Sequence, residues 1–221
     1  MGQWSRESII ETLGRHPPAS RSTRLDLRGV DWRGLDLSGV NLSDLDISEA
    51  NLAGVDASRV IAVGTDFART LLPAQLAGAD LSGADLYKSE GGGVDFTGAR
   101  LIGARLLRGN FYHANFSSAD LSAAIMTDGI FDGCNFSGAV LNRAEVSIGP
   151  GNCIVDGATA REATGAVQTG ETVRLRGEPV SALEWFRAQS SSIEPYSGRL
   201  PDASVVRLRQ WLEAYLVRDH A

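Results

Sequence analysis

A five-residue period in the apolar residues constrains the fold of this chain more than any other feature. Stepping by five from Leu27, the sequence places an apolar residue at every step as far as Phe67. The step resumes at Leu76 and continues to Val146, and Gly91 is its only member without an apolar side chain. This period matches neither the 3.6 residues of a helix nor the 2 of a flat strand. It therefore predicts a repeating unit with its own geometry.

Each five-residue unit has the same internal pattern. Two positions before each central residue lies a small or aliphatic residue, as Ala79 lies before Leu81. Because alternate residues of an extended segment point to the same side, both are predicted to face inward. The residue between them, mostly Asp or Asn, faces outward, and the last two positions, often Ser-Gly, favour a turn. Each unit is thus a short extended piece followed by a corner, and successive units wind into a coil with an apolar interior.

The residues of individual units resemble a known family. Residues 50–54, 79–83 and 119–123 have the sequences ANLAG, ADLSG and ADLSA, which are similar to the A-(D/N)-L-x-x consensus of pentapeptide-repeat proteins. The resemblance covers residues 25 to 148. It implies an all-β solenoid, a right-handed quadrilateral β-helix of pentapeptide repeats with four units in each coil. The ends of such a solenoid need caps, because they expose apolar side chains and unpaired strand edges.

Three segments depart from the period. Residues 70–73 hold four residues where five are expected, which predicts a shortened corner or a loop. The unit at residues 89–93 keeps the register but turns Gly91 inward, which predicts a weakly packed coil or a water site. Beyond Val146 the pattern weakens, and degenerate units such as residues 158–162 leave a further coil open.

We expect three regions: an N-terminal helical cap (1–24), the repeat coil (25–165) and a C-terminal helical region for capping or dimerisation (166–221). Residues 5–14 predict a helix that begins after Ser5, turns Ile9, Ile10 and Leu13 to one face and stops at Gly14.

The tail loses the five-residue step from about Glu171. It predicts a short helix over residues 181–189, a polar loop around residues 190–198, and a second helix from Asp202 to about Val217. The second helix carries a wide apolar stripe, formed by Val205, Leu208, Trp211, Leu212, Tyr215 and Leu216. This stripe covers either the last coil of its own chain or the same tail of a second chain. We favour the homodimer, which the family resemblance also implies.

The net charge of −6 is concentrated in the first half of the coil. Residues 25–95 contain twelve acidic and five basic residues, whereas residues 96–148 contain four of each. The register stacks outward carboxylates on two opposite faces: Asp26, Asp46, Asp66 and Asp85 on one, and Asp36, Asp56 and Asp95 on the other. These seven carboxylates extend over about 15 Å of axis. Their spacing of about 2 Å is comparable with the roughly 1.7 Å per charge of duplex DNA. Outward Asp and Asn also make local turn hydrogen bonds, so a merely solvated surface is the alternative.

The sequence contains no recognisable catalytic or cofactor-binding constellation. His16, His113 and His220 are scattered, and Gly91–Gly93 lacks the Lys-Ser/Thr of a phosphate loop. We therefore expect no enzyme activity, no cofactor and no metal. No apolar stretch approaches the roughly 20 residues of a membrane span, and Cys134 and Cys153 lack zinc-type spacing. We expect a cytoplasmic protein that contacts no membrane and, given its acidic surface, binds no nucleic acid directly.

The family resemblance implies a function for the acidic columns. Proteins of its quinolone-resistance branch mimic DNA, occupy the DNA-binding surface of DNA gyrase or topoisomerase IV, and inhibit the enzyme or protect it from poisons. Our first hypothesis is such a DNA mimic with a role in antibiotic resistance. The alternative is a rigid protein–protein interaction scaffold or regulator unrelated to topoisomerases, because a fold does not fix a function.

Overall fold

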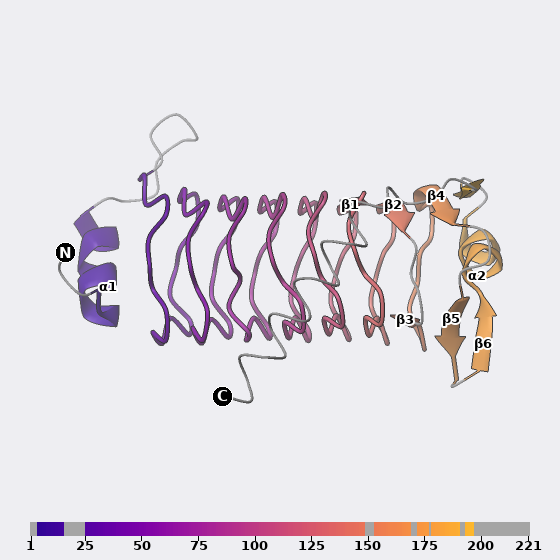
Figure 1. Cartoon of the computed structure of the whole chain (residues 1–221), viewed down its shortest axis with the longest axis horizontal. Coiled ribbons are helices and arrows are strands. Elements are labelled where there is room, and N and C mark those ends of the chain that lie inside the picture. Colours follow the sequence, from indigo (N-terminus) through magenta and orange to yellow (C-terminus); the bar gives the residue numbers. More distant parts are fainter. Residues whose placement is uncertain are drawn as a thin grey trace, which may run out of the picture.

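The computed structural model describes residues 4–15, 25–148, 153–168, 172–176, 178–190 and 193–196. It is an elongated stack of coils, with helix α1 (Arg6–Arg15) at one end and helix α2 (Ala182–Gln189) at the other (Figure 1). Each coil has four bridge positions, and each residue of the first coils is bridged to the residue four units further along. The predicted β-solenoid with four units in each coil is therefore present. We number its faces 1 to 4 by their first bridges, which are Asp26↔Asp46, Asp31↔Asn51, Asp36↔Asp56 and Asn41↔Ile61.

The central residue of almost every unit lies inside the coil, as predicted. Phenylalanine rings form two stacked columns within this interior. Phe116 lies between Phe96 and Phe136, with centroid distances of 4.8 and 5.1 Å and nearly parallel planes. Phe111 stacks on Phe131 at 5.2 Å, and the two columns meet edge-on where Phe111 contacts Phe116 at 6.0 Å. All five rings are at most 3% exposed, so aromatic contacts run through the middle of the core.

The predicted weak packing around Gly91 is wrong. A Cβ atom at Gly91 would lie 2.8 Å from Cδ1 of Phe111 and 3.1 Å from Cδ1 of Leu72. Gly129 is similarly close to Phe131, at 2.6 Å from Cε2. The space that the missing side chains leave is therefore filled by phenylalanine rings, and glycine is needed there for steric reasons.

The irregular segment at residues 70–73 is a shortened unit. Ladder partners across it are 19 residues apart, as in Asp56↔Gln75, and the spacing of 20 residues returns at Gln75↔Asp95. The shorter spacing recurs near the end of the coil, as in Asn135↔Ile154 and Val140↔Thr159. Leu72 is only 4% exposed and serves as the inward residue of this shortened unit. The coil thus keeps its four faces across the irregularity.

The corners are tight turns in which one residue adopts left-handed backbone. At a typical corner the N–H of Ala84 donates to the carbonyl of Leu81 at 3.0 Å, and Gly83 has φ +65°. Glycine takes this conformation at little cost, and other residues do so less readily. Among the described residues, thirteen glycines and thirteen other residues nevertheless have a positive φ, so the corner position does not require glycine.

Helix α1 covers the first coil. The Ser5 hydroxyl accepts a hydrogen bond from the Ser8 N–H at 3.2 Å, which confirms the predicted N-cap. Ile9 is 1% exposed and Leu13 packs beside it, but Ile10 is 48% exposed, so its predicted inward position is wrong. Ile9 and Leu13 are four residues apart and share a face, whereas Ile10 is turned about 100° from Ile9. The helix also continues through the predicted stop at Gly14 to Arg15.

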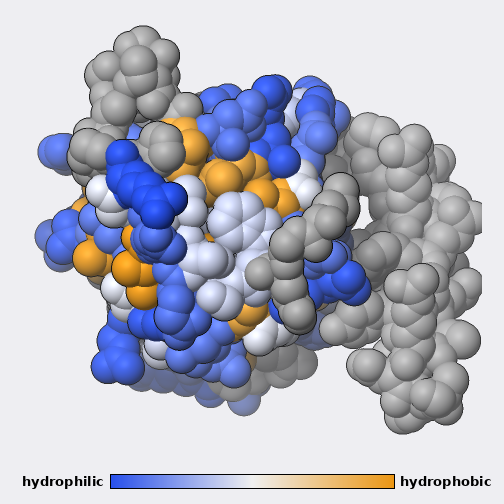
Figure 2. All heavy atoms as spheres, turned by 90° about the vertical axis from the view of Figure 1, so that its left-hand side faces the viewer, coloured by the Kyte–Doolittle hydropathy of each residue, from blue (hydrophilic) through white to orange (hydrophobic). Residues whose placement is uncertain are grey.

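Two further contacts attach this end. Trp4 meets Trp32 edge-on with a centroid distance of 5.9 Å. The Arg6 guanidinium donates to the carbonyl oxygens of Asp36 and Ser38, both at 2.8 Å. Arg6 therefore binds backbone acceptors of the first coil. Figure 2 shows this end of the molecule, where apolar side chains remain at the surface between hydrophilic ones.

A further coil follows the main repeat, over residues 153–168. Face 1 continues as a parallel sheet of β1 (Ile125–Thr127), β2 (Glu145–Ile148), β4 (Thr164–Gln168) and β7 (Ile193–Tyr196). Face 3 continues as β3 (Cys153–Ile154) and β5 (Thr172–Leu175), to which β6 (Glu178–Ser181) pairs antiparallel. The prediction of a helical tail from about Glu171 is therefore wrong for β5, β6 and β7.

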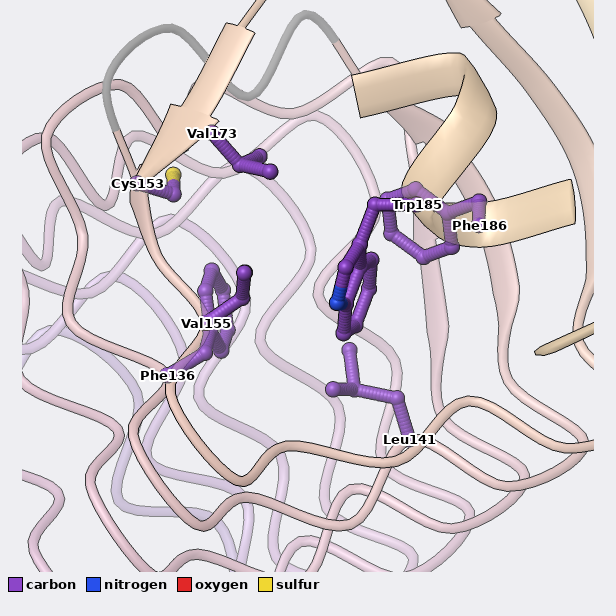
Figure 3. A pocket seen from close by; sticks show the side chains of 7 residues that line it. All are labelled: Phe136, Leu141, Cys153, Val155, Val173, Trp185 and Phe186. Carbon is purple, nitrogen blue, oxygen red and sulfur yellow. The ribbon is translucent and has the colours of Figure 1, made fainter. Parts of the chain in front are cut away.

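The predicted helix after Ser181 is present as α2, and the Ser181 hydroxyl accepts from the Glu184 N–H at 3.3 Å. Phe186 is 3% exposed. A cavity of about 10 Å³ lies between α2 and the last coil (Figure 3). The lining of this cavity is apolar, so the cavity offers no hydrogen-bond partners to a bound water. The lining residues are Phe136, Leu141, Cys153, Val155, Val173, Trp185 and Phe186. The second predicted helix, residues 202–217, lies outside the described residues.

Candidate protein-binding surface

The seven predicted surface carboxylates lie in two ladders. Asp26, Asp46, Asp66 and Asp85 are bridged in succession on face 1. On face 3, Asp36 and Asp56 are followed by Gln75 and then by Asp95. The two faces are two units apart in a four-unit coil and are therefore opposite each other.

Each of these carboxylates also has a local structural role. Its Oδ1 atom accepts a hydrogen bond from the backbone N–H two residues later, for example from Ser58 to Asp56 at 2.9 Å. Asn41 and Asn51 accept the same bond, at 3.0 and 3.1 Å, without carrying a charge. Corner formation therefore explains why Asp or Asn recurs at this position, and it leaves the second carboxylate oxygen for other contacts. The same bond at the other predicted carboxylates is donated by Arg28, Ser38, Ser48, Ala68, Tyr87 and Thr97.

Arginines neutralise much of face 1. Arg28 binds Asp26 at 2.7 Å, and its Nε lies 3.9 Å from Asp46. Hydrogen bonds from the Arg28 guanidinium and then from its N–H lower the pKa of Asp26 from 3.8 to about 2. Further along the face, Arg105 binds Asp85 at 2.7 Å. The arginine side chains in these pairs are about half exposed or more, so each pair contributes little to stability.

Face 3 keeps more of its charge unpaired. Arg6 of α1 lies 3.2 Å from Asp36. Hydrogen bonds from Ser38, with a smaller contribution from Arg6, lower the pKa of Asp36. Within the described part of the chain, no Arg or Lys forms an ion pair with Asp56 or Asp95. Asp95 accepts a hydrogen bond from the Asn115 amide at 3.3 Å.

The structure also locates the other residues that the sequence singled out. His113 lies at a corner, with Nδ1 3.3 Å from the Gly133 carbonyl oxygen and its ring beside Tyr112. His16 and His220 lie outside the described residues. In the described ranges, no three His, Cys, Asp or Glu residues are arranged to hold a metal ion. No helix in the same ranges is long and apolar enough to cross a membrane.

Cys134 and Cys153 are buried, unbonded thiols in the interior of the coil. The Cys134 thiol donates to the Phe111 carbonyl at 3.0 Å, and the Cys153 thiol donates to the Phe131 carbonyl at 2.9 Å. Burial raises the pKa of the Cys134 thiol. Both side chains therefore act as small buried residues of the core.

The apolar stripe predicted to form a dimer (Val205, Leu208, Trp211, Leu212, Tyr215 and Leu216) lies outside the described residues.

Comparison with known proteins identifies the repeat. Residues 23–56, 74–106 and 92–128 match the family model for pentapeptide repeats, with eight copies. A comparison with curated protein sequences gives no significant match.

Several solved structures are similar to this chain. One is HetL, a pentapeptide repeat protein involved in heterocyst differentiation regulation from the cyanobacterium Nostoc sp. strain PCC 7120. It is 20% identical over 76% of this chain and 73% of its own, with a TM-score of 0.42. Full-length QnrB1, a plasmid-mediated fluoroquinolone resistance protein, is 19% identical over 85% of this chain and 97% of its own, with a TM-score of 0.33. A pentapeptide repeat protein from the Arabidopsis thaliana thylakoid lumen is 21% identical over 67% and 71%, with a TM-score of 0.27.

The matched repeats and the geometry of the coil agree. The family model matches both segments on either side of the shortened unit at residues 70–73. In the same segments each bridged residue pairs with the residue four units, or one coil, further along the chain. Residues 23–56 and 74–128 of this chain are therefore pentapeptide repeats.

Proposed function

We propose that this protein is a non-catalytic DNA mimic that binds a type II topoisomerase, with DNA gyrase as the first candidate. Binding modulates the topoisomerase or protects it from topoisomerase poisons. The observation that carries the proposal is the alignment of seven Asp residues in two straight ladders. With a coil rise of about 4.8 Å, they give about one carboxylate per 2 Å of axis, close to the roughly 1.7 Å per charge of duplex DNA. The choice of topoisomerase rests on the family resemblance.

Face 3 is the better candidate for the contact. Asp56 and Asp95 form no ion pair with a described residue, whereas Arg28 and Arg105 bind carboxylates of face 1. A basic partner surface would meet unpaired charge on face 3 but would have to displace arginines on face 1. Docking through face 3 therefore requires less rearrangement.

The proposal includes four further expectations. The coil is right-handed, as the resemblance implies. Two chains associate through the apolar stripe of residues 205–216, so that Trp211→Glu with Leu212→Glu gives a monomer by light scattering. The protein binds no nucleic acid directly, since its surface has the same sign of charge. It works in the cytoplasm, where the thiols of Cys134 and Cys153 stay reduced.

The second candidate is a rigid interaction scaffold unrelated to topoisomerases. It is favoured by the hydrogen bond that each predicted carboxylate already accepts at its corner, because this bond explains the recurrence of Asp without any partner. The ion pairs of Asp26 and Asp85 also reduce the resemblance of face 1 to DNA.

A gyrase supercoiling assay with and without a quinolone separates the two candidates. Asp56→Asn with Asp95→Asn removes two charges from face 3 but keeps the oxygen that accepts the corner hydrogen bond. Asp46→Asn with Asp66→Asn removes the same charge from face 1 and is the matched control. We expect the parent protein to change supercoiling or cleavage-complex accumulation, more strongly at low salt, and the face 3 variant to lose most of this effect. No effect of the parent protein at micromolar concentration contradicts the topoisomerase proposal.

A further inference from the structure

The corner between faces 1 and 2 differs from the other three in the residues that adopt left-handed backbone. On five successive coils this position is charged, in the order acidic, basic, basic, basic, acidic. We call this row the charged corner; it consists of Glu49, Arg69, Lys88, Arg108 and Asp128, with φ between +55° and +60°. Backbone hydrogen bonds join these coils directly, as from Arg69 to Tyr87 at 2.8 Å and from Lys88 to Leu107 at 3.1 Å.

The equivalent positions at the other corners are mostly glycine. The corner between faces 2 and 3 has Gly34, Gly54, Gly93, His113 and Gly133, and the corner between faces 3 and 4 has Gly39, Arg59, Gly78, Gly98, Ser118, Gly138 and Gly157. The corner between faces 4 and 1 has Asp44, Gly64, Gly83, Gly103, Ala123, Arg143 and Glu162. A left-handed residue other than glycine costs roughly 1–2 kcal/mol. The charged corner incurs this cost on five successive coils, a longer run than at any other corner of the described residues.

Within the row only the two arginines pair with carboxylates, while Lys88 and Arg108 also donate hydrogen bonds to the Tyr87 side chain. Arg69 pairs with Glu49 at 3.1 Å, and Arg108 pairs with Asp128 at 3.5 Å. Within the described part of the chain, Lys88 forms no ion pair, and its Nζ lies 5.3 Å from the ring centroid of Tyr87. All five side chains of the row are exposed, and exposed ion pairs are weak. The two arginines can therefore exchange their partners for another anion.

The spacing of the three cations fits one kind of partner. Adjacent coils are about 4.8 Å apart, so the Cα atoms of Arg69 and Arg108 are separated by about 10 Å. On an α-helix, residues i, i+4 and i+7 lie on one face and span about 10.5 Å. The acidic residues at both ends of the row repel a longer anion such as a nucleic acid strand.

We propose that the charged corner is a docking edge for an α-helix of a protein partner that carries three acidic residues at positions i, i+4 and i+7. The helix lies along the rod, and its carboxylates bind Arg69, Lys88 and Arg108. Tyr87 supplies an aromatic surface beside the central cation. This edge is independent of the topoisomerase proposal, which uses the opposite sign of charge on face 3.

The test uses the full chain and a fluorescent helical peptide with Glu at i, i+4 and i+7. A peptide of the same composition with the Glu residues spread around the helix is the matched ligand. Fluorescence anisotropy at low salt is expected to show tighter binding of the striped peptide. Lys88→Gln weakens this binding about threefold, and Lys88→Glu about tenfold, because exposed charge pairs each contribute up to about 1 kcal/mol. Arg59→Gln removes one left-handed cation from another corner and leaves binding unchanged.

Lys88→Gly separates a role of Lys88 in binding from a role in folding, because it should weaken peptide binding without lowering the melting temperature. Glycine relieves the left-handed backbone, so thermal unfolding should occur at a temperature equal to or higher than that of the parent protein. Binding of the striped peptide should fall as in Lys88→Gln. Equal binding of both peptides, an equal loss in Arg59→Gln, preferential binding of a single-stranded oligonucleotide, or destabilisation by Lys88→Gly would each overturn the proposal.

Discussion

The ring of Phe111 lies where the side chain of residue 91 would be, so that Gly91 and Phe111 together fill one level of the interior. A Cβ at position 91 would lie 2.8 Å from the ring. We expect Gly91→Ala to lower the free energy of unfolding by about 1–3 kcal/mol, because the interior cannot expand without strain. Chemical denaturation measures this change. In a Phe111→Leu background the same substitution should have a smaller effect, and an equal effect in both backgrounds would contradict the steric explanation.

Phe116 has ring partners on both sides, Phe96 and Phe136. Phe116→Asp would introduce a charge without a partner into this column, so we expect no soluble, cooperatively melting protein. Phe116→Leu is the control, and it should fold with reduced stability. Circular dichroism during heating distinguishes the two variants. A folded Phe116→Asp protein would show that the interior tolerates charge.

Two positions on one corner offer a reciprocal exchange. Ala123 has φ +56° and Gly103, one coil earlier, has φ +64° with open space around it. Ala123→Gly should raise the free energy of unfolding by about 0.5–1 kcal/mol, and Gly103→Ala should lower it by about 1 kcal/mol. Denaturation of both variants measures the two changes. Changes of the same sign would exclude backbone conformation as the cause.

The pair formed by Asp26 and Arg28 predicts a pH dependence. Because the pKa of Asp26 is lowered from 3.8 to about 2 in the folded chain, its contribution to stability is present above about pH 4 and is lost as the pH falls toward 2. Asp26→Asn keeps the corner acceptor but removes the charge. The melting temperature of the parent protein should exceed that of Asp26→Asn at pH 7, and the difference should shrink steadily from pH 4 to pH 2, where about half of the Asp26 carboxyl groups are protonated. A difference that stays constant between pH 4 and pH 2 would assign the effect to something other than the carboxylate.

Both edge strands at the C-terminal end contain an exposed proline, Pro179 in β6 and Pro195 in β7. Proline has no N–H to donate to another strand. We therefore expect Pro179→Val with Pro195→Val to cause association that grows with protein concentration, measured by light scattering. Glu178→Gln is a control that alters β6 but restores no N–H. A double variant with the mass of the parent protein would assign protection of this end to other residues.

Much of the fold could be predicted because inward residues recur at fixed spacing. The period alone predicts that Trp32, Phe96 and Phe116 lie inside the coil and that the unit at residues 70–73 is shortened. The period could not show that Phe111 fills the space beside Gly91, because the ring of Phe111 extends from its own coil into the coil of Gly91. The tail was harder still, since β5, β6 and β7 end the coil without repeating its pattern.

The predicted surface illustrates a second limit. The register predicts the two ladders of Asp residues, and it also predicts which arginines lie beside them. Counting four units onward from Asp85 leads to Arg105, whose guanidinium binds that carboxylate. Arg6 could not be found this way, because α1 lies outside the repeat and its position depends on how the helix packs.

The unit at residues 70–73 forms one complete side of the coil, although it has four residues where a regular unit has five. Inserting or deleting one whole unit between Asp85 and Arg105 would rotate everything that follows by a quarter turn and move Arg105 away from Asp85. Lengthening the rod without scrambling its surfaces therefore requires four units at a time.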